Sequence, residues 1–460
     1  MIKKITQYLL QRRYALSFLF MLLILQSTLA QVQNPEMYAR FDEKTRTLTF
    51  YYNTNKQSGD QSGDFEIKNQ STPTWDKKKY DIRIVNFDES FKNARPKKCE
   101  GWFKEFRLLE NINNLKYLNT SEVVSMKSMF ENCRYLKSLD LSSFDTKNVE
   151  DMSYMFKGCE KLETIYVGDG FDVIRVGQSG DMFKNCKKIN GAITYQDSST
   201  DKYEANWYGY FRKKVGMNGD EPIGAVSHPL KIKYSLSLSD SKAFELYENC
   251  IVNSAYYTRS MKSEWGTLCL PFTINITHWS NTCNFYTLKN IGNESVVLEL
   301  IENGTVEAGQ PVVIRNKDNT KTDIRISSVN NTKVVKEPKN TNTGNRLMGT
   351  FTNMELADDC YFIANNQFRL VSNYKPATSG VKLAAFRAYI QPQKTNVKHA
   401  PSLNISVDEE TTGIETSNVL DLLNDKEAEY YDVNGQRIQN LQKGINIVKK
   451  GNKTMKIVCR

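Results

Sequence analysis

The 460-residue sequence lacks most of the patterns that mark an enzyme. It has three histidines, His228, His278 and His399, and no two of them have the spacing that binds zinc on one helix. No Gly-x-Ser-x-Gly elbow, phosphate-binding loop or dinucleotide-binding glycine set occurs. We therefore predict that the protein is not an enzyme, and that it uses no cofactor and no bound metal.

The nine cysteines of the chain do not show the paired spacing of zinc sites. A catalytic cysteine can still meet its histidine in the folded protein, because such residues are neighbours in space and not in sequence. Cys269 with His278 is the candidate pair. A secreted hydrolase with its site in the second half of the chain is therefore an alternative.

Long apolar runs are confined to the N-terminus. Four basic residues precede an apolar run over residues 15–25, and Thr28-Leu29-Ala30 supplies a cleavage site of the small-residue type. This pattern predicts a secretory signal peptide over residues 1–30, cleaved between Ala30 and Gln31, with an uncleaved anchor as the alternative. No other run is long and apolar enough to cross a bilayer, so we expect no transmembrane span after cleavage. We expect a secreted protein, or one at the cell surface in association with the outer membrane.

Positive charge is in modest excess. The formal net charge is +10, and four of the basic residues lie in the predicted signal peptide. The short lysine runs at residues 77–79 and 97–98 are typical of solvated faces, and no nucleic-acid-binding module occurs. We expect no nucleic-acid partner.

The chain contains an internal repeat with a period of 26 residues. Self-similarity of this kind indicates stacked units that bury their apolar faces against one another. Within a unit the apolar spacing i, i+3, i+4, i+7 predicts a short helix, and the following i, i+2 pair predicts a strand. The predicted core residues of the three clearest units are Met126, Met129, Phe130, Cys133, Leu136 and Leu139; Met152, Met155, Phe156, Cys159, Leu162 and Ile165; and Met182, Phe183 and Cys186.

The rest of the chain divides by texture into further regions. Residues 31–98 are predicted to form an N-terminal β cap with a hairpin over residues 38–52, and residues 99–215 hold the repeats with a C-terminal cap. The aromatic residues of that cap alternate with basic ones, so an aromatic-basic binding patch is the alternative. Alternating apolar residues then predict an antiparallel β-sandwich-like domain over residues 228–403. A polar stretch over residues 404–417 predicts a linker, and residues 418–460 are predicted to form a small β tail.

The residues of the first clear repeat resemble those of the BspA-like leucine-rich repeat family, which includes surface proteins of Bacteroidetes. The matching positions are Leu118, Asn119, Thr120, Val123, Met126, Met129, Phe130, Cys133, Leu136, Leu139, Asp140, Leu141 and Ser142. A mycoplasma surface-protein repeat of unknown function has the same pattern. The tail resembles the C-terminal sorting module of type IX secretion but lacks its usual Pro-Asn-Pro opening; the matching residues are Tyr431, Asp432, Val433, Asn434 and Gly435. The resemblance implies a leucine-rich repeat fold and a role in adhesion, with no residue-level binding motif.

These observations predict a mixed, β-rich fold. A short leucine-rich-repeat solenoid of helix-strand units would be followed by the β-sandwich-like domain and the small β module. We expect a binding protein that adheres, through the solenoid, to an extracellular protein or glycan of a host matrix or of another bacterium. A structural component of a surface assembly is a further alternative, beside the hydrolase.

Overall fold

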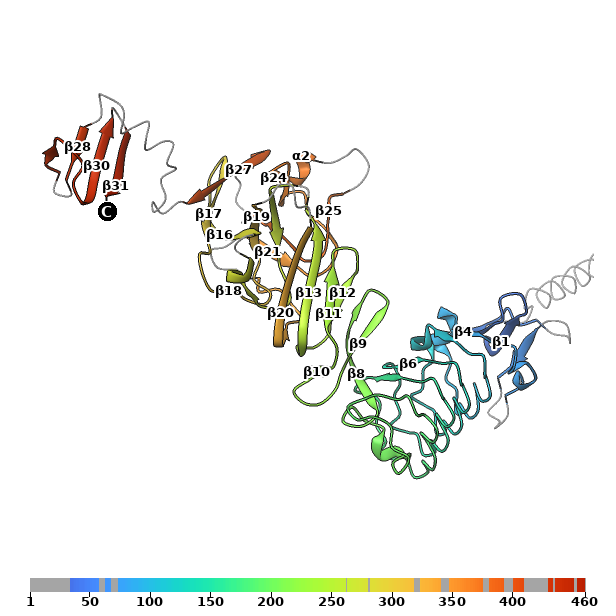
Figure 1. Ribbon diagram of the computed structural model, residues 1–460. Coiled ribbons are helices and arrows are strands. Elements are labelled where there is room, and N and C mark those ends of the chain that lie inside the picture. Colours follow the sequence, from blue (N-terminus) through green and yellow to red (C-terminus); the bar gives the residue numbers. More distant parts are fainter. Residues whose placement is uncertain are drawn as a thin grey trace, which may run out of the picture. The chain divides into compact units, whose positions relative to one another are not determined.

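A computed structural model of the protein shows two compact units, which divide between residues 216 and 234 (Figure 1). Strands make up 42% of the described residues and helices 6%. The predicted signal peptide, with Ala30 and Gln31, lies outside the described residues. The structure describes residues 34–57, 63–67, 73–261, 263–279, 282–317, 323–340, 347–374, 380–392, 400–408, 429–432, 435–450 and 453–459.

The first unit consists of short strands and 3₁₀ turns. The predicted hairpin is confirmed as β1 and β2, which pair antiparallel, and β2 continues into a parallel ladder with β4 and β5. The strands are β1 (Glu36–Asp42), β2 (Thr47–Asn53), β3 (Asp64–Glu66), β4 (Ile84–Phe87), β5 (Asn111–Asn113), β6 (Ser138–Leu141), β7 (Thr164–Val167), β8 (Phe211–Asn218), β9 (Glu221–Ala225) and β10 (Lys231–Ile232). The 3₁₀ turns are η1 (Asp76–Lys78), η2 (Glu89–Asn93), η3 (Leu115–Tyr117) and η4 (Lys202–Glu204).

The predicted helix-strand solenoid is wrong, because residues 126–133 and their counterparts form successive turns and no helix. Ser128 and Asn132 adopt left-handed backbone conformations, with φ of 55° and 60°. A right-handed helix cannot pass through such residues. The strand half is present in the first two units, since β6 and β7 pair in parallel with Leu139 opposite Ile165, but the third unit has no strand in the fully described stretch between Cys186 and β8.

Each repeat unit forms one coil of the stack. Within the turn segment of a coil, successive backbone amides donate alternately to the next coil and to the same coil. The amides of Ser128 and Phe130 donate to the carbonyls of Ser153 and Met155 in the next coil, at 2.9 and 2.8 Å. The amide between them, that of Met129, donates back to Met126 at 3.1 Å. Backbone donors that a helix would pair internally therefore tie one coil to the next.

Buried side chains repeat the same stacking. The rings of Phe103, Phe130, Phe156 and Phe183 follow one another with centroid separations of 5.3, 5.7 and 5.4 Å. The thiol of Cys159 donates to the Phe130 carbonyl at 3.1 Å, and the other repeat cysteines make equivalent bonds. Each coil thus depends on both neighbours for its core.

Among its described residues, the second unit contains most of the strands of the structure, one 3₁₀ turn, η5 (Ile276–Trp279), and one short α-helix, α2 (Val371–Tyr374). Its strands are β11 (Leu236–Ser239), β12 (Phe244–Leu246), β13 (Cys250–Ser260), β14 (Trp265–Leu268), β15 (Ile274–Asn275), β16 (Cys283–Ile291), β17 (Ser295–Leu300), β18 (Thr305–Val306), β19 (Val312–Asn316), β20 (Asp323–Val334), β21 (Leu347–Thr350), β22 (Met354–Glu355), β23 (Tyr361–Ala364), β24 (Gln367–Leu370), β25 (Lys382–Leu383), β26 (Arg387–Ile390) and β27 (Ser402–Asp408).

The β-rich character predicted for this region is confirmed, but its main sheet is nearly closed and barrel-like. The strand order is β14-β19-β16-β17-β27-β24-β23-β26-β21. β14, at one end of this order, is linked to β26 near the other end. The Thr267 hydroxyl of β14 donates to the Ala388 carbonyl of β26 at 2.7 Å and accepts from the Ala388 amide at 2.9 Å. The prediction of antiparallel strands also missed a parallel pair, β17 with β27. A second sheet has β13 at its centre, parallel to β11 and antiparallel to β20.

The C-terminal strands form a separate four-stranded sheet in the order β29-β28-β30-β31. They are β28 (Glu429–Tyr431), β29 (Arg437–Ile438), β30 (Gly444–Lys450) and β31 (Lys453–Cys459). The first five residues of the predicted linker, 404–408, belong to β27 and pair with β17. No helix of the described residues has the length and apolar character to cross a membrane.

Substitution of two glycines in the coils tests the left-handed turn geometry. Gly158 has a φ of 73°, and a Cβ there would collide with Asn132 Oδ1, whereas a Cβ on Gly180 would meet nothing within 4 Å. We expect G158A to lower the free energy of coil opening by about 1–2 kcal/mol or more, and G180A to leave it nearly unchanged. Hydrogen exchange of peptides from residues 120–190, read by mass spectrometry, measures both. Equal protection in the two variants would contradict the turn geometry.

Candidate binding surfaces

The predicted repeat-core residues, from Met126 to Cys186, are all buried and no more than 3% exposed. They hold the coils together and are not accessible to a partner. A binding surface in this unit must consist of residues that the repeat pattern did not select.

The residues that follow each repeat cysteine form such a surface, which we call the corner surface. It comprises Arg134, Tyr135, Lys137, Glu160, Lys161, Glu163, Lys187 and Lys188. Equivalent positions in successive coils form columns on this surface. Backbone hydrogen bonds between coils hold these columns in place, since the Glu163 amide donates to the Lys137 carbonyl at 2.8 Å. The composition of the stretches after Cys133, Cys159 and Cys186 is a signal for this surface that the apolar pattern alone does not contain.

The corner surface is basic and carries an exposed aromatic ring. Its eight residues include five cations and two carboxylates. Lys161 Nζ lies 3.7 Å from the centroid of the Tyr135 ring, which is 47% exposed, and Arg134 pairs with Glu160 at 3.5 Å. A cation over a ring face is attracted by the ring quadrupole, so the pair holds Lys161 in place.

In the predicted C-terminal cap, the aromatic rings of Tyr210 and Phe211 pack on the repeat core. Tyr210 and Phe211 are buried, and the Phe211 ring lies 6.2 Å from that of Phe156 and 5.7 Å from that of Phe183. The alternative, an aromatic-basic patch, applies to the outer residues only. Tyr208 is exposed, and Lys213 Nζ lies 5.3 Å from the centroid of the Trp207 ring.

The two residues of the candidate catalytic pair lie in different environments. Cys269 is fully buried, and its thiol donates to the Gly309 carbonyl at 3.3 Å, whereas His278 is exposed in η5. Burial raises the pKa of the Cys269 thiol far above its usual range, so that it stays protonated at neutral pH. Within the described ranges, no group of three or more histidine, cysteine or acidic residues is placed to hold a metal.

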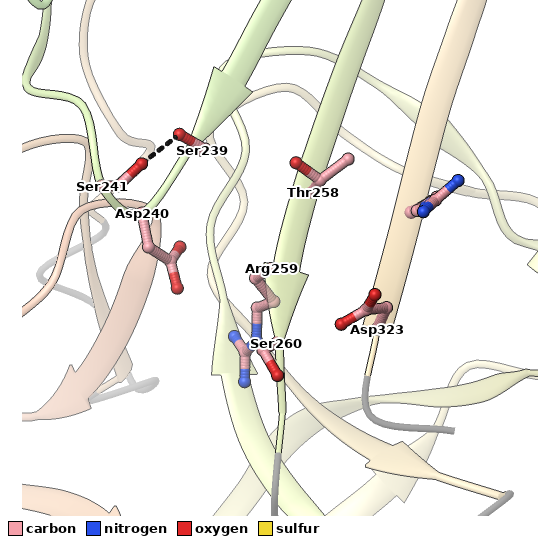
Figure 2. Close-up of a pocket in the computed structure, with 8 residues that line it drawn as sticks. Ser239, Asp240, Ser241, Thr258, Arg259, Ser260 and Asp323 are labelled. Atoms are coloured by element: carbon pink, nitrogen blue, oxygen red, sulfur yellow. Dashed lines mark hydrogen bonds between the residues drawn. The ribbon is translucent and has the colours of Figure 1, made fainter. Parts of the chain in front are cut away.

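A second surface lies in the second unit, at an open pocket of about 460 Å³ (Figure 2). Behind it, Arg387 donates to both oxygens of Asp240, one of these bonds being 3.0 Å long, and the Tyr257 hydroxyl donates to the same carboxylate. The pocket is lined by Ser239, Asp240, Ser241, Thr258, Arg259, Ser260, Asp323 and Arg325. None of these residues belongs to a motif that the sequence displays.

Two groups near this pocket have strongly shifted acidities. Burial raises the pKa of Tyr257 to about 12, so its hydroxyl remains a donor at neutral pH. Burial, together with repulsion from Arg387, lowers the pKa of Arg259 to about 10, which still leaves the guanidinium charged at neutral pH. Arg259 is 8% exposed and donates to the Thr267 carbonyl at 2.7 Å, while its Nε has no hydrogen-bond partner among the described residues.

Residues 97–216 match a protein family described as "Mycoplasma protein of unknown function, DUF285". The match covers the coils and their C-terminal cap, which is about a quarter of the chain, and its description assigns no activity. No curated protein and no solved structure matches the chain.

Thiol labelling tests the role of the buried cysteines. Burial raises the pKa of Cys133, Cys159 and Cys269 well above the usual range. We expect iodoacetamide at about pH 8, near the ordinary thiol pKa of about 8.5, to leave these residues unmodified in the native protein and to modify them after denaturation. Peptide mass spectrometry reads each site. Rapid modification of native Cys269 alone would instead identify it as an activated nucleophile and support the hydrolase.

Proposed function

We propose that this chain is a secreted or surface-exposed binding protein whose corner surface docks an extracellular protein partner with an acidic face. The observation that carries the proposal is the position of Arg134, Tyr135, Lys161, Lys187 and Lys188 at the same corner of successive coils. The secreted location rests on the signal-peptide pattern of residues 1–30, which is a feature of the sequence.

Rigidity of the coils supports this role. Backbone bonds between coils fix the spacing of the corner columns, so the surface is organised before a partner arrives. Binding then loses little conformational entropy in the backbone. A basic face also raises the association rate with an acidic partner, and that contribution weakens as salt increases.

An affinity comparison with charge-matched variants tests the proposal. The mature protein is screened against immobilised extracellular-matrix proteins and glycans, and the strongest ligand is measured with a K161E/K188E variant. We expect at least about tenfold weaker binding, because reversed charges face the acidic partner, and weaker binding of the parent between about 0.05 and 0.3 M salt.

The matched control is K127E/K147E, which changes the same net charge at two exposed positions outside the corner surface. It should retain the parent affinity. Equal loss in both double variants would reduce the effect to net charge, and absence of any protein ligand would overturn the proposal. Selective binding to glycans through the corner surface would replace the protein partner with a sugar one, and a mass that increases with concentration would favour self-assembly.

Surface exposure of the coils is a separate prediction. Brief protease treatment of intact cells should release peptides from residues 100–200, since the corner surface must face outward to reach a partner. Mass spectrometry identifies the released peptides, and a cytoplasmic protein serves as the control for lysis. Complete protection until lysis would place the chain inside the envelope and contradict the proposed location.

A further inference from the structure

The outer face of the sheet around β13 carries aligned polar side chains. The strand register places Thr258 between Ser239 of β11 and Arg325 of β20, and it places Ser260 opposite Asp323. All of these residues point away from the buried face, on which Tyr257 and Ile324 lie. Residues of three strands, of which β20 lies more than 60 residues from the other two in sequence, thus assemble one polar surface (Figure 2).

Most of these side chains make no bond to another described residue. Ser239 and Ser241 are paired through their hydroxyls at 2.9 Å. Among the described residues, the side chains of Thr258, Ser260, Asp323 and Arg325 have no hydrogen-bond or ion-pair partner. Arg325 and Asp323 have opposite charges and lie two residues apart on one face, yet they do not pair. Their donors and acceptors are available to a ligand.

An aromatic ring borders the same surface. Tyr256 precedes Thr258 by two residues, so both project from the same face of β13, and Tyr256 is 41% exposed. Exposed tyrosine combines an apolar ring face with a hydroxyl, which suits ligands that are partly apolar and partly polar. The pocket volume of about 460 Å³ is within the range of small-ligand sites.

Two residues that line the pocket, Asp240 and Arg259, are held in place by bonds on the buried side of the sheet. Asp240 is fixed by Arg387 and Tyr257, and Arg259 is fixed by its bond to the Thr267 carbonyl. The site therefore presents positive and negative groups together with hydroxyls, in positions that the protein determines before binding. Such preorganisation favours binding, because little ordering remains to be done.

We propose that this pocket binds one sugar unit of a glycan. Sugar hydroxyls can donate to Asp323 and accept from Arg325 and the serine and threonine hydroxyls, while the C–H face of the ring packs on Tyr256. A simple anion would bind the arginines but would be repelled by Asp323 and Asp240, which a neutral polyol is not. This site is separate from the corner surface and does not depend on the function proposed for it.

The test uses the full chain, a glycan array and saturation-transfer NMR with methyl glycosides of glucose, galactose, mannose, N-acetylglucosamine and glucuronic acid. We expect at least one glycoside to receive saturation. Its affinity should fall about tenfold or more in Y256A and in D323N, because each variant removes a contact worth more than about 1 kcal/mol. D323N keeps the shape of the side chain and isolates the role of its charge.

V329A is the matched control, because Val329 is 56% exposed on β20 and lies outside the pocket lining. It should bind the glycoside like the parent. No binding to any glycoside or array glycan would overturn the proposal, as would equal affinity in Y256A, D323N and the parent. Binding of inorganic sulfate that depends on Arg325, without any saccharide binding, would identify an anion site and also overturn it. Because these variants lie outside the corner surface, their outcome is independent of the protein-docking test.

Discussion

The first unit depends on one feature of its backbone, the alternation of amides between local turns and the next coil. Left-handed residues such as Ser128 and Asn132 rotate successive peptides, so that every second N–H points along the stack. A coil on its own would leave these donors without partners, and an unpaired buried amide is costly. The coils therefore stabilise one another, and the stack needs closed ends. The β1–β2 hairpin sheet extends to β5 at one end, and β8 joins β7 at the other.

This constraint separates the residues that fold the coils from the residues that can bind. The ring stack from Phe103 to Phe183 and the thiol bonds of the repeat cysteines occupy the interior. Positions just after each cysteine face solvent and make few demands on the core, so their charge can differ from coil to coil. Arg134, Glu160 and Lys187 occupy one such column, with both signs represented. The basic excess and the exposed Tyr135 are therefore properties of the surface, which stacking does not require.

The sequence predicts the parts of the fold that local rules determine. The hairpin over residues 38–52 has alternating apolar and polar residues. Between β23 and β24, Asn365 and Asn366 adopt positive φ, which asparagine tolerates. The helix prediction fails because inward-facing residues of stacked turns share the spacing of a helix face, and the left-handed Ser128, Tyr154 and Asp181 are not glycines. The pocket proposed to bind a sugar unit could not be predicted from the sequence either. It needs the register between β13 and β20, strands more than 60 residues apart, which no local pattern encodes.

The buried charge of Arg259 argues that the pocket has a functional role. A buried guanidinium is expensive unless it is paired and fully hydrogen-bonded. Here Arg259 has one backbone acceptor, its Nε lacks a partner among the described residues, and Arg387 repels it. Gly266 leaves the room that its Nη2 occupies, because a Cβ at that position would lie 2.5 Å from it. Replacement of a buried charged group by a well-packed apolar side chain of similar volume is often neutral or stabilising. Stability alone therefore does not account for a charge at this position, whereas a fixed cation in the lining of the proposed ligand pocket does.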